Sequence, residues 1–256
     1  MIESKEKSKA SRATVTIGME DVPWLDKKDI QEILAATPPH LRDAVKNGTP
    51  SLGSGAVYPI PLDEIVLTQK DVEKLRPFPA HWKYLYGMDV GWNRTAVMFV
   101  VQDTDNDIMY VYDEYSQGKM EPEIHAARIL QKGSWMIGAI DPASRGRSQV
   151  DGMQLIKIYR QLGLRVREAN NEVEAGIFKI WSRLSAGKLK FFPNTLQLQN
   201  EYLLYRRDDT GKIVKEHDHC LDALRYAINT FHLATPKPES IDRPLINKQA
   251  IPHYNV

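Results

Sequence analysis

The central part of the chain begins with a strand-like run of aromatic and apolar residues at 84–90, which contains a single carboxylate, Asp89. Gly91 then permits a tight turn, and the β-branched run 95–101 follows as the expected antiparallel partner. A polar loop at 102–107 leads to a third apolar run. We therefore predict a three-stranded meander, in which the acids of the polar loop serve the turn and do not bind metal.

After the meander, helical spacings alternate with short apolar runs. The pattern predicts helices over 121–131, 151–162, 172–186 and 217–232, and strands over 135–140, 164–167 and 188–192. Residues 197–205 fit either a helix or a strand, and 206–215 resemble a hairpin that turns at 209–211. This order indicates an α/β fold, with a mixed sheet of the meander plus parallel strands, flanked by helices.

The ends of the chain contain fewer core residues. Residues 1–79 are predicted to be an N-terminal arm or linker, with a polar start, a short strand at 15–17, a helix at 26–36 and a second short helix opened by Pro38-Pro39. The main domain is expected at 80–235. Residues 236–256 contain three prolines after Pro236 and little that could pack, so we expect a C-terminal tail.

Connectivity brings two carboxylates together at one edge of the sheet. A helical crossover makes the strand at 135–140 parallel to an earlier one, and the natural partner is the strand at 84–90. Asp89 and Asp141 then end neighbouring strands at the same edge, where strands lie about 4.8 Å apart. Two carboxylates that close repel each other unless a cation or a proton lies between them.

The last predicted helix adds two more acids, Asp218 and Asp222, one helical turn apart. An adjacent apolar stripe would dock on the sheet and place these acids beside its edge. A solvated acidic face, with Asp218 interacting with the helix N-terminus, is the alternative. Asp89, Asp141 and Asp222, with Asp218 as the next candidate ligand, form an all-oxygen set that suits Mg²⁺ or Mn²⁺. Two such ions can promote the hydrolysis of a phosphodiester.

Composition restricts the partners and the compartment. The 34 Lys and Arg residues against 33 Asp and Glu give a net charge of +1, so any nucleic-acid binding must come from local clusters. The single cysteine, Cys220, is expected to be packed in the core and needs no oxidising compartment. No apolar run is long enough for a membrane span, and the polar start has no signal-peptide centre, so we expect a protein that is not secreted and binds no membrane.

Three separated stretches carry a resemblance to a known family. They are 86–95 around Asp89, 140–148 beginning Ile-Asp-Pro-Ala-Ser-Arg, and 218–226 with the sequence Asp-His-Cys-Leu-Asp-Ala-Leu-Arg-Tyr. Together they resemble, over about residues 80–232, the C-terminal nuclease domain of large terminase subunits, the DNA-packaging motors of tailed bacteriophages. The resemblance implies an RNase H-like fold and Mg²⁺- or Mn²⁺-dependent cleavage of concatemeric double-stranded DNA in the cytoplasm of the host cell.

The same resemblance implies an ATPase motor domain, a small terminase subunit and a portal protein as partners. Family members carry the ATPase upstream, whereas this sequence contains no phosphate-binding loop, so we expect no ATP hydrolysis from this chain. The chain is then either a nuclease-containing fragment or the partner of a motor on another polypeptide. A junction resolvase or transposase-type nuclease of the same fold, and a noncatalytic DNA-binding scaffold, remain the alternatives.

Basic side chains near the acids are the candidate DNA contacts. Arg145 and Arg147 follow Asp141 in a Gly/Ser loop, where they could grip a phosphate. The other candidates lie on the hairpin that leads into the last helix: Arg206, Arg207, Lys212 and Lys215. The competing interpretation is that the hairpin cations only solvate a loop. No base-reading element is evident, so we expect backbone contacts without sequence specificity.

Overall fold

The computed structural model describes residues 18–36, 46, 55–145, 154–208 and 211–239. The chain divides into two compact units, one of Met1–Val57 with Arg206–Val214 and one of Tyr58–Tyr205 with Lys215–Val256. In the first unit, η1 (Met19–Asp21) precedes α1 (Lys27–Ala36), which confirms the predicted helix at 26–36. The predicted strand at 15–17 lies outside the described residues, as does the second short helix apart from Lys46.

The hairpin after residue 205 also belongs to the first unit. Arg207 and Ile213 form an antiparallel bridge, and the Arg207 amide donates to the Gly55 carbonyl at 2.7 Å. Gly211 has φ +80°, a left-handed conformation that glycine adopts without strain. The described part of this segment therefore has the predicted hairpin form.

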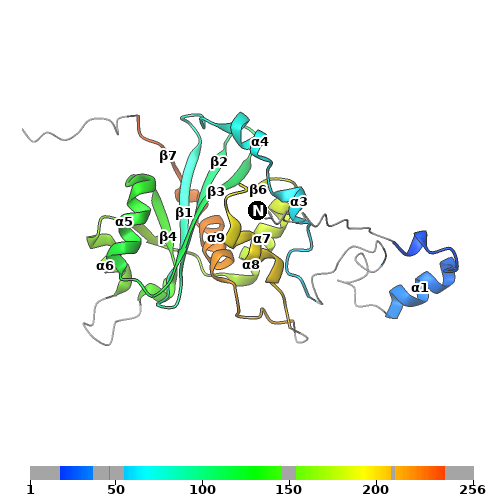
Figure 1. The fold of residues 1–256 in the computed structure, drawn as a ribbon. Coiled ribbons are helices and arrows are strands. Elements are labelled where there is room, and N and C mark those ends of the chain that lie inside the picture. Colours follow the sequence, from blue (N-terminus) through cyan, green and yellow to red (C-terminus); the bar gives the residue numbers. More distant parts are fainter. Residues whose placement is uncertain (1–17, 37–45, 47–54, 146–153, 209–210, 240–256) are drawn as a thin grey trace, which may run out of the picture. The chain divides into compact units, whose positions relative to one another are not determined.

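A mixed seven-stranded sheet is the centre of the second unit (Figure 1). Its strands are β1 (Lys83–Asp89), β2 (Thr95–Asp103), β3 (Ile108–Gln117), β4 (Ile137–Ile140), β5 (Arg165–Glu168), β6 (Leu189–Phe191) and β7 (Thr235–Pro236). The order is β5-β4-β1-β2-β3-β6, and β7 pairs with β1. The β1–β2 and β2–β3 pairs are antiparallel, whereas β4 is parallel to β1, β5 to β4 and β6 to β3. The predicted meander and parallel strands are therefore confirmed.

Helices cover both faces of this sheet (Figure 1). One face carries α5 (Pro122–Gly133) and α6 (Leu155–Gln161), whose Ile129 and Tyr159 are buried against the sheet. The other face carries α7 (Val173–Ser185), α8 (Leu196–Leu204) and α9 (His219–Asn229). Residues 197–205, for which helix and strand were both open, are therefore helical. No helix in the described ranges is long and apolar enough to cross a membrane.

The predicted acidic turn between β2 and β3 is confirmed as turn chemistry. The Asp103 carboxylate accepts the amide protons of Asp105 and Asn106 at 2.9 and 3.2 Å. Its other oxygen accepts from the Asn106 side chain at 2.8 Å. Each bond is local, as expected of an Asp that starts a turn.

Residues 58–79 pack into the second unit, although the sequence pattern placed them in the arm. They form α3 (Leu62–Ile65) and α4 (Gln69–Leu75), and the Leu67 amide donates to the Phe191 carbonyl at 2.9 Å. Ile65 and Val72 are buried. The two buried side chains lie in two short helices that are separated by a break, so no continuous periodicity reveals that this segment joins the core.

Candidate active site

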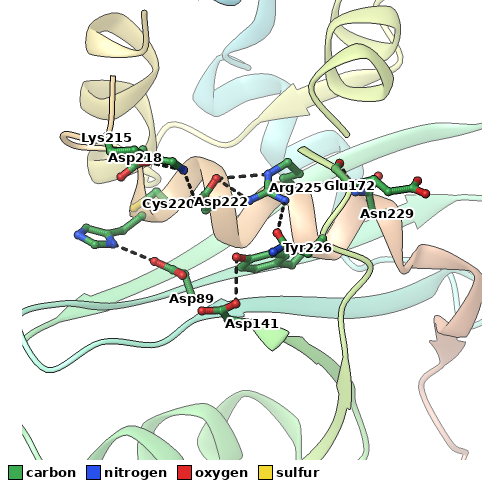
Figure 2. Close-up of polar contacts among 12 residues, drawn as sticks. Asp89, Asp141, Glu172, Lys215, Asp218, Cys220, Asp222, Arg225, Tyr226 and Asn229 are labelled. Carbon is green, nitrogen blue, oxygen red and sulfur yellow. Dashed lines mark hydrogen bonds and ion pairs between the residues drawn. The ribbon is translucent and has the colours of Figure 1, made fainter. Parts of the chain in front are cut away.

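The first two candidate ligands lie on paired parallel strands. Met88 of β1 is paired with Ile140 of β4, and the amide of Asp141 donates to the Met88 carbonyl at 2.9 Å. Asp89 and Asp141 directly follow this pair, and their side chains lie side by side in Figure 2. The predicted adjacency of these two residues is therefore confirmed by the strand register.

The alternation of β1 decides which way Asp89 faces. Tyr84, Tyr86 and Met88 belong to the core that also contains α5 and α6. Gly87 faces α9, because a Cβ atom there would lie 1.9 Å from the Ala223 carbonyl oxygen. Side chains two residues apart in a strand point to the same face, so Asp89 is on the α9 side. The absence of a side chain at Gly87 lets the α9 backbone approach the sheet.

Helix α9 is buried on almost its whole circumference, including its acids. Asp218, the N-cap residue, is 7% exposed and Asp222 is 9% exposed. The alternative of a solvated acidic face therefore does not hold. Cys220 is fully buried, as predicted.

Basic side chains of the chain itself contact these carboxylates (Figure 2). His219 Nδ1 lies 2.8 Å from Asp89 Oδ2. Lys215 Nζ lies 3.1 Å from Asp218 Oδ2 and 3.2 Å from Asp222 Oδ2, and so bridges the two acids of the helix. The acidic cluster is therefore partly neutralised from within.

Arg225 holds the other oxygen of Asp222. Its Nη2 and Nε atoms lie 2.8 and 3.2 Å from Asp222 Oδ1, and its Nη1 donates to the side chain of Asn171 at 3.0 Å. The guanidinium is buried and lies 4.7 Å from the centre of the Tyr226 ring. Tyr226 in turn donates its hydroxyl proton to Asp141 Oδ1 at 3.2 Å. These contacts link α9 to the carboxylate at the end of β4.

The electrostatics of the site are those of a crowded acidic cluster. Burial raises the pKa of Asp89; the hydrogen bond from His219 opposes this rise, and the charges of Asp222 and Asp141 add to it. The hydrogen bond to Asp89 raises the pKa of His219, and burial opposes that rise. The pKa values of both groups are raised. At Asp89, the effect of burial outweighs the attraction to His219, whereas at His219 the attraction to Asp89 outweighs the effect of burial. The site therefore favours a cation next to Asp89.

Comparison with known proteins identifies the family. Residues 86–231, more than half of the chain, match the family described as the terminase RNaseH-like domain. The chain belongs to this terminase family. The match begins in β1 and ends after α9, so it contains Asp89, Asp141 and Asp222. The fold is therefore RNase H-like, as the sequence resemblance implied.

Individual relatives agree with this assignment. The large terminase subunit of Salmonella phage P22 is 27% identical over an alignment of 253 positions, and the alignment covers 92% of this chain and 49% of that protein. The large terminase subunit of Enterobacteria phage LP7 is 28% identical over 227 residues, with 84% and 46% covered. The chain thus spans about half the length of the curated relatives that it matches.

Solved structures agree as well. The nuclease domain of the P22 large terminase superposes with a TM-score of 0.63 and 26% identity, covering 73% of this chain and 97% of that domain. The large terminase of the thermophilic bacteriophage D6E, in complex with ADP, gives a TM-score of 0.58 at 22% identity, over 86% of this chain and 55% of that protein. This second likeness shows the shared fold.

The side chains at this site provide the type of ligand atom that a hard divalent cation prefers. Asp89, Asp141 and Asp222 offer carboxylate oxygens from three neighbouring elements, and such oxygens suit Mg²⁺ and Mn²⁺. Within the described ranges, no three His, Cys, Asp or Glu side chains are already arranged around a common metal position. Asp89 is instead paired with His219, and Asp222 with Lys215 and Arg225, so an ion bound to either carboxylate would replace some of these contacts.

A buried glutamate that the sequence analysis missed fixes the start of α9. Asp218 makes no side-chain hydrogen bond to the helix end, although it is the N-cap residue. Instead, Glu201 of α8 accepts the amide proton of Cys220 at 2.6 Å. Glu114 of β3 accepts the amide protons of Gln197 and Leu198 at the start of α8, at 2.8 and 2.9 Å. Glu201 therefore performs the capping, and the Asp218 carboxylate pairs with Lys215 instead.

We expect Glu201→Ala to lower the free energy of unfolding by about 1–3 kcal/mol, because the variant loses a helix cap and leaves a buried amide unpaired. Glu201→Gln keeps an oxygen acceptor and should lose less. Urea unfolding followed by circular dichroism measures both. Equal stability of Glu201→Ala and the parent would show that another group caps α9.

Two further residues of the site, His219 and Tyr226, were part of the recognised sequence stretch but had no assigned role. The sequence does contain a signal for Tyr226, because it lies four residues after Asp222 and therefore on the same helical face. Its bond to Asp141 joins residues 85 positions apart. Such a distant partner is not encoded in the periodicity of the helix.

The predicted DNA-contacting cations fall into different parts of the chain. Arg145 ends η3 (Pro142–Arg145), and its side chain lies outside what the structure describes, as does the whole of Arg147. Arg206, Arg207 and Lys212 belong to the first unit, where Arg207 Nη1 donates to the Gly211 carbonyl at 2.9 Å. Lys215 belongs to the second unit and contacts the acids of α9.

Proposed function

We propose that this chain supplies the DNA-cutting activity of a phage large terminase, as a divalent-metal-dependent endonuclease that cleaves concatemeric double-stranded viral DNA with little sequence preference. One observation carries the proposal. Asp89 and Asp141 end paired parallel strands, and Asp222 of the buried helix α9 adjoins Ala223, whose backbone packs directly against Gly87 of β1. Buried acids this close are costly to a fold, and a bound cation would offset that cost.

In this proposal, Asp89, Asp141 and Asp222 hold Mg²⁺ or Mn²⁺, as two ions. Bound there, the ions would activate water and stabilise the leaving oxygen of the phosphodiester. Asp222 is preferred over Asp218 because it adjoins Ala223, which packs against Gly87, two residues before Asp89. Asp218 is the alternative ligand if Asp222 does not bind the ions. Arg225 and Tyr226 orient Asp222 and Asp141 through the hydrogen bonds described above.

DNA is held in this proposal through its backbone. The net charge of +1 provides no general attraction, so local cations must supply it. We assign this task to Arg145, Arg147, Arg206, Arg207, Lys212 and Lys215. Each phosphate contact adds about one unit to the slope of log affinity against log salt concentration, so binding should weaken steeply with salt.

The wider setting follows from the relatives. The P22 and LP7 proteins are large terminase subunits of about twice the matched length. We therefore propose that this domain works in the host cytoplasm with an ATPase motor domain, a small terminase subunit and a portal protein.

Plasmid cleavage tests the proposal. The purified chain with Mg²⁺ or Mn²⁺ should nick and then degrade supercoiled plasmid, EDTA should stop the reaction, and cutting should decline steeply with added salt. Sequencing of the cut ends should show little preference between sites. Cutting that persists in EDTA, or a plasmid that stays intact with both metals at low salt, would reject the proposal.

A further inference from the structure

Lys215 covers the acids of α9 on their solvent side. Its ammonium lies 3.1 Å from Asp218 Oδ2 and 3.2 Å from Asp222 Oδ2. The Lys215 side chain is 61% exposed, whereas those of Asp218 and Asp222 are 9% and 12% exposed. An exposed cation thus lies on two carboxylates that are nearly buried (Figure 2).

The local backbone explains this position. Lys215 precedes Asp218 by three residues and Asp222 by seven. Between them, His217 has φ +53°, a left-handed conformation that is uncommon for a residue other than glycine. This turn places Lys215 beside the first turn of the helix that it precedes.

The two cations on Asp222 differ in how firmly they are held. Arg225, on Oδ1, is 2% exposed and is also bonded to Asn171. The Lys215 ammonium, on Oδ2, contacts the two carboxylates and ends a flexible four-carbon stem. The Lys215 side chain is exposed to solvent, and an incoming divalent ion would supply the positive charge that the two carboxylates need, so the Lys215 contacts can be exchanged. The Arg225 contacts cannot, because a buried carboxylate would lose its partner.

Lys215 is charged in this position. A lysine ammonium is ordinarily protonated at neutral pH, and the two carboxylates within 3.2 Å of it favour that charged form. The ammonium therefore supplies a full positive charge next to Asp222, one of the carboxylates that would bind a metal ion.

We propose that Lys215 is an exchangeable cation, which neutralises Asp218 and Asp222 in the metal-free protein and is released to bind a DNA phosphate when a divalent ion takes its place. This inference rests on the proposed function, since it requires a metal ion at these carboxylates. Metal and DNA then strengthen each other's binding, because each favours the state in which Lys215 has left the acids. The free domain would bind DNA weakly until the metal site is filled.

The test measures binding and not cleavage. Titration calorimetry with Mn²⁺ alone should show Lys215→Met binding the ion about tenfold more tightly than the parent, because a nearby like charge that competes for the acids is gone. Fluorescence anisotropy then measures the affinity for a short duplex with phosphorothioate linkages, with and without Mn²⁺. In the parent, Mn²⁺ should tighten binding about tenfold or more. In Lys215→Met, this effect of Mn²⁺ should fall to about twofold.

Matched variants separate this role from a general loss of charge. Lys157→Met removes an exposed lysine of α6 and should behave as the parent in both measurements. Lys215→Arg keeps the charge and should keep most of the coupling. Unchanged or weaker Mn²⁺ binding by Lys215→Met, or undiminished coupling, would overturn the inference while leaving the proposed nuclease intact. A parent protein that binds no Mn²⁺ would overturn both.

Discussion

Replacing Asp89 by Asn is expected to lower the rate of plasmid cleavage by about 1,000-fold, since a lost metal ligand removes about 4 kcal/mol of transition-state stabilisation. Asp89 interacts with the other groups of the site: the charges of Asp222 and Asp141 raise its pKa, and His219 is hydrogen-bonded to it. Single-turnover cleavage with saturating Mn²⁺ measures the effect. Asp63→Asn, which changes an exposed acid of α3, is the matched control and should cut at the parental rate.

The same variant distinguishes a lost ligand from a lost fold. The pKa of Asp89 is higher in the folded than in the unfolded protein, mainly through burial, so folding favours its protonated form. The stability that this group contributes is present below its unfolded pKa and is lost as pH rises through its folded pKa. In EDTA at pH 7, the Asp89→Asn variant should therefore unfold at no lower urea concentration than the parent. Retained cleavage in a folded Asp89→Asn variant would contradict the assigned role.

Gly87→Ala should be among the most damaging changes to the fold. The added Cβ would lie 1.9 Å from the Ala223 carbonyl oxygen and 2.7 Å from the Ala227 amide nitrogen. Both are backbone atoms, so α9 itself has to move away from β1. We expect a loss of about 1–3 kcal/mol or more in the free energy of unfolding, the usual cost of overpacking a core. Cleavage should fall as well, because Asp222 moves with the helix.

Urea unfolding and plasmid cleavage measure the two effects of Gly87→Ala. Gly91→Ala is the matched control at the same end of β1, where the nearest atom to an added Cβ is the Arg94 carbonyl oxygen at 3.0 Å. This milder contact should cost less stability. If Gly87→Ala unfolds at the parental urea concentration, then α9 does not approach β1 as closely as described.

The strands and their register show how far pattern and connectivity reach. The run from Thr95 is apolar and β-branched enough to identify β2, and the two-residue alternation explains why Asp89 shares a face with Gly87. A helical crossover returns β4 to the side of β1, which predicts the neighbouring carboxylates. Strand identity and strand order follow from local patterns and from general rules of chain connection, so both can be predicted from the sequence.

By itself, then, the sequence determined the mixed sheet, its flanking helices and the neighbouring strand ends at Asp89 and Asp141, because hydrophobic period and chain connectivity suffice for these. Only the tertiary structure decided which groups face the acids. The bond from Cys220 to Glu201 depends on how α8 packs against α9, and the bond from Tyr226 to Asp141 joins residues 85 positions apart. A polar contact needs atoms within about 3 Å, and the relative position of two helices sets that distance, whereas periodicity along one helix does not.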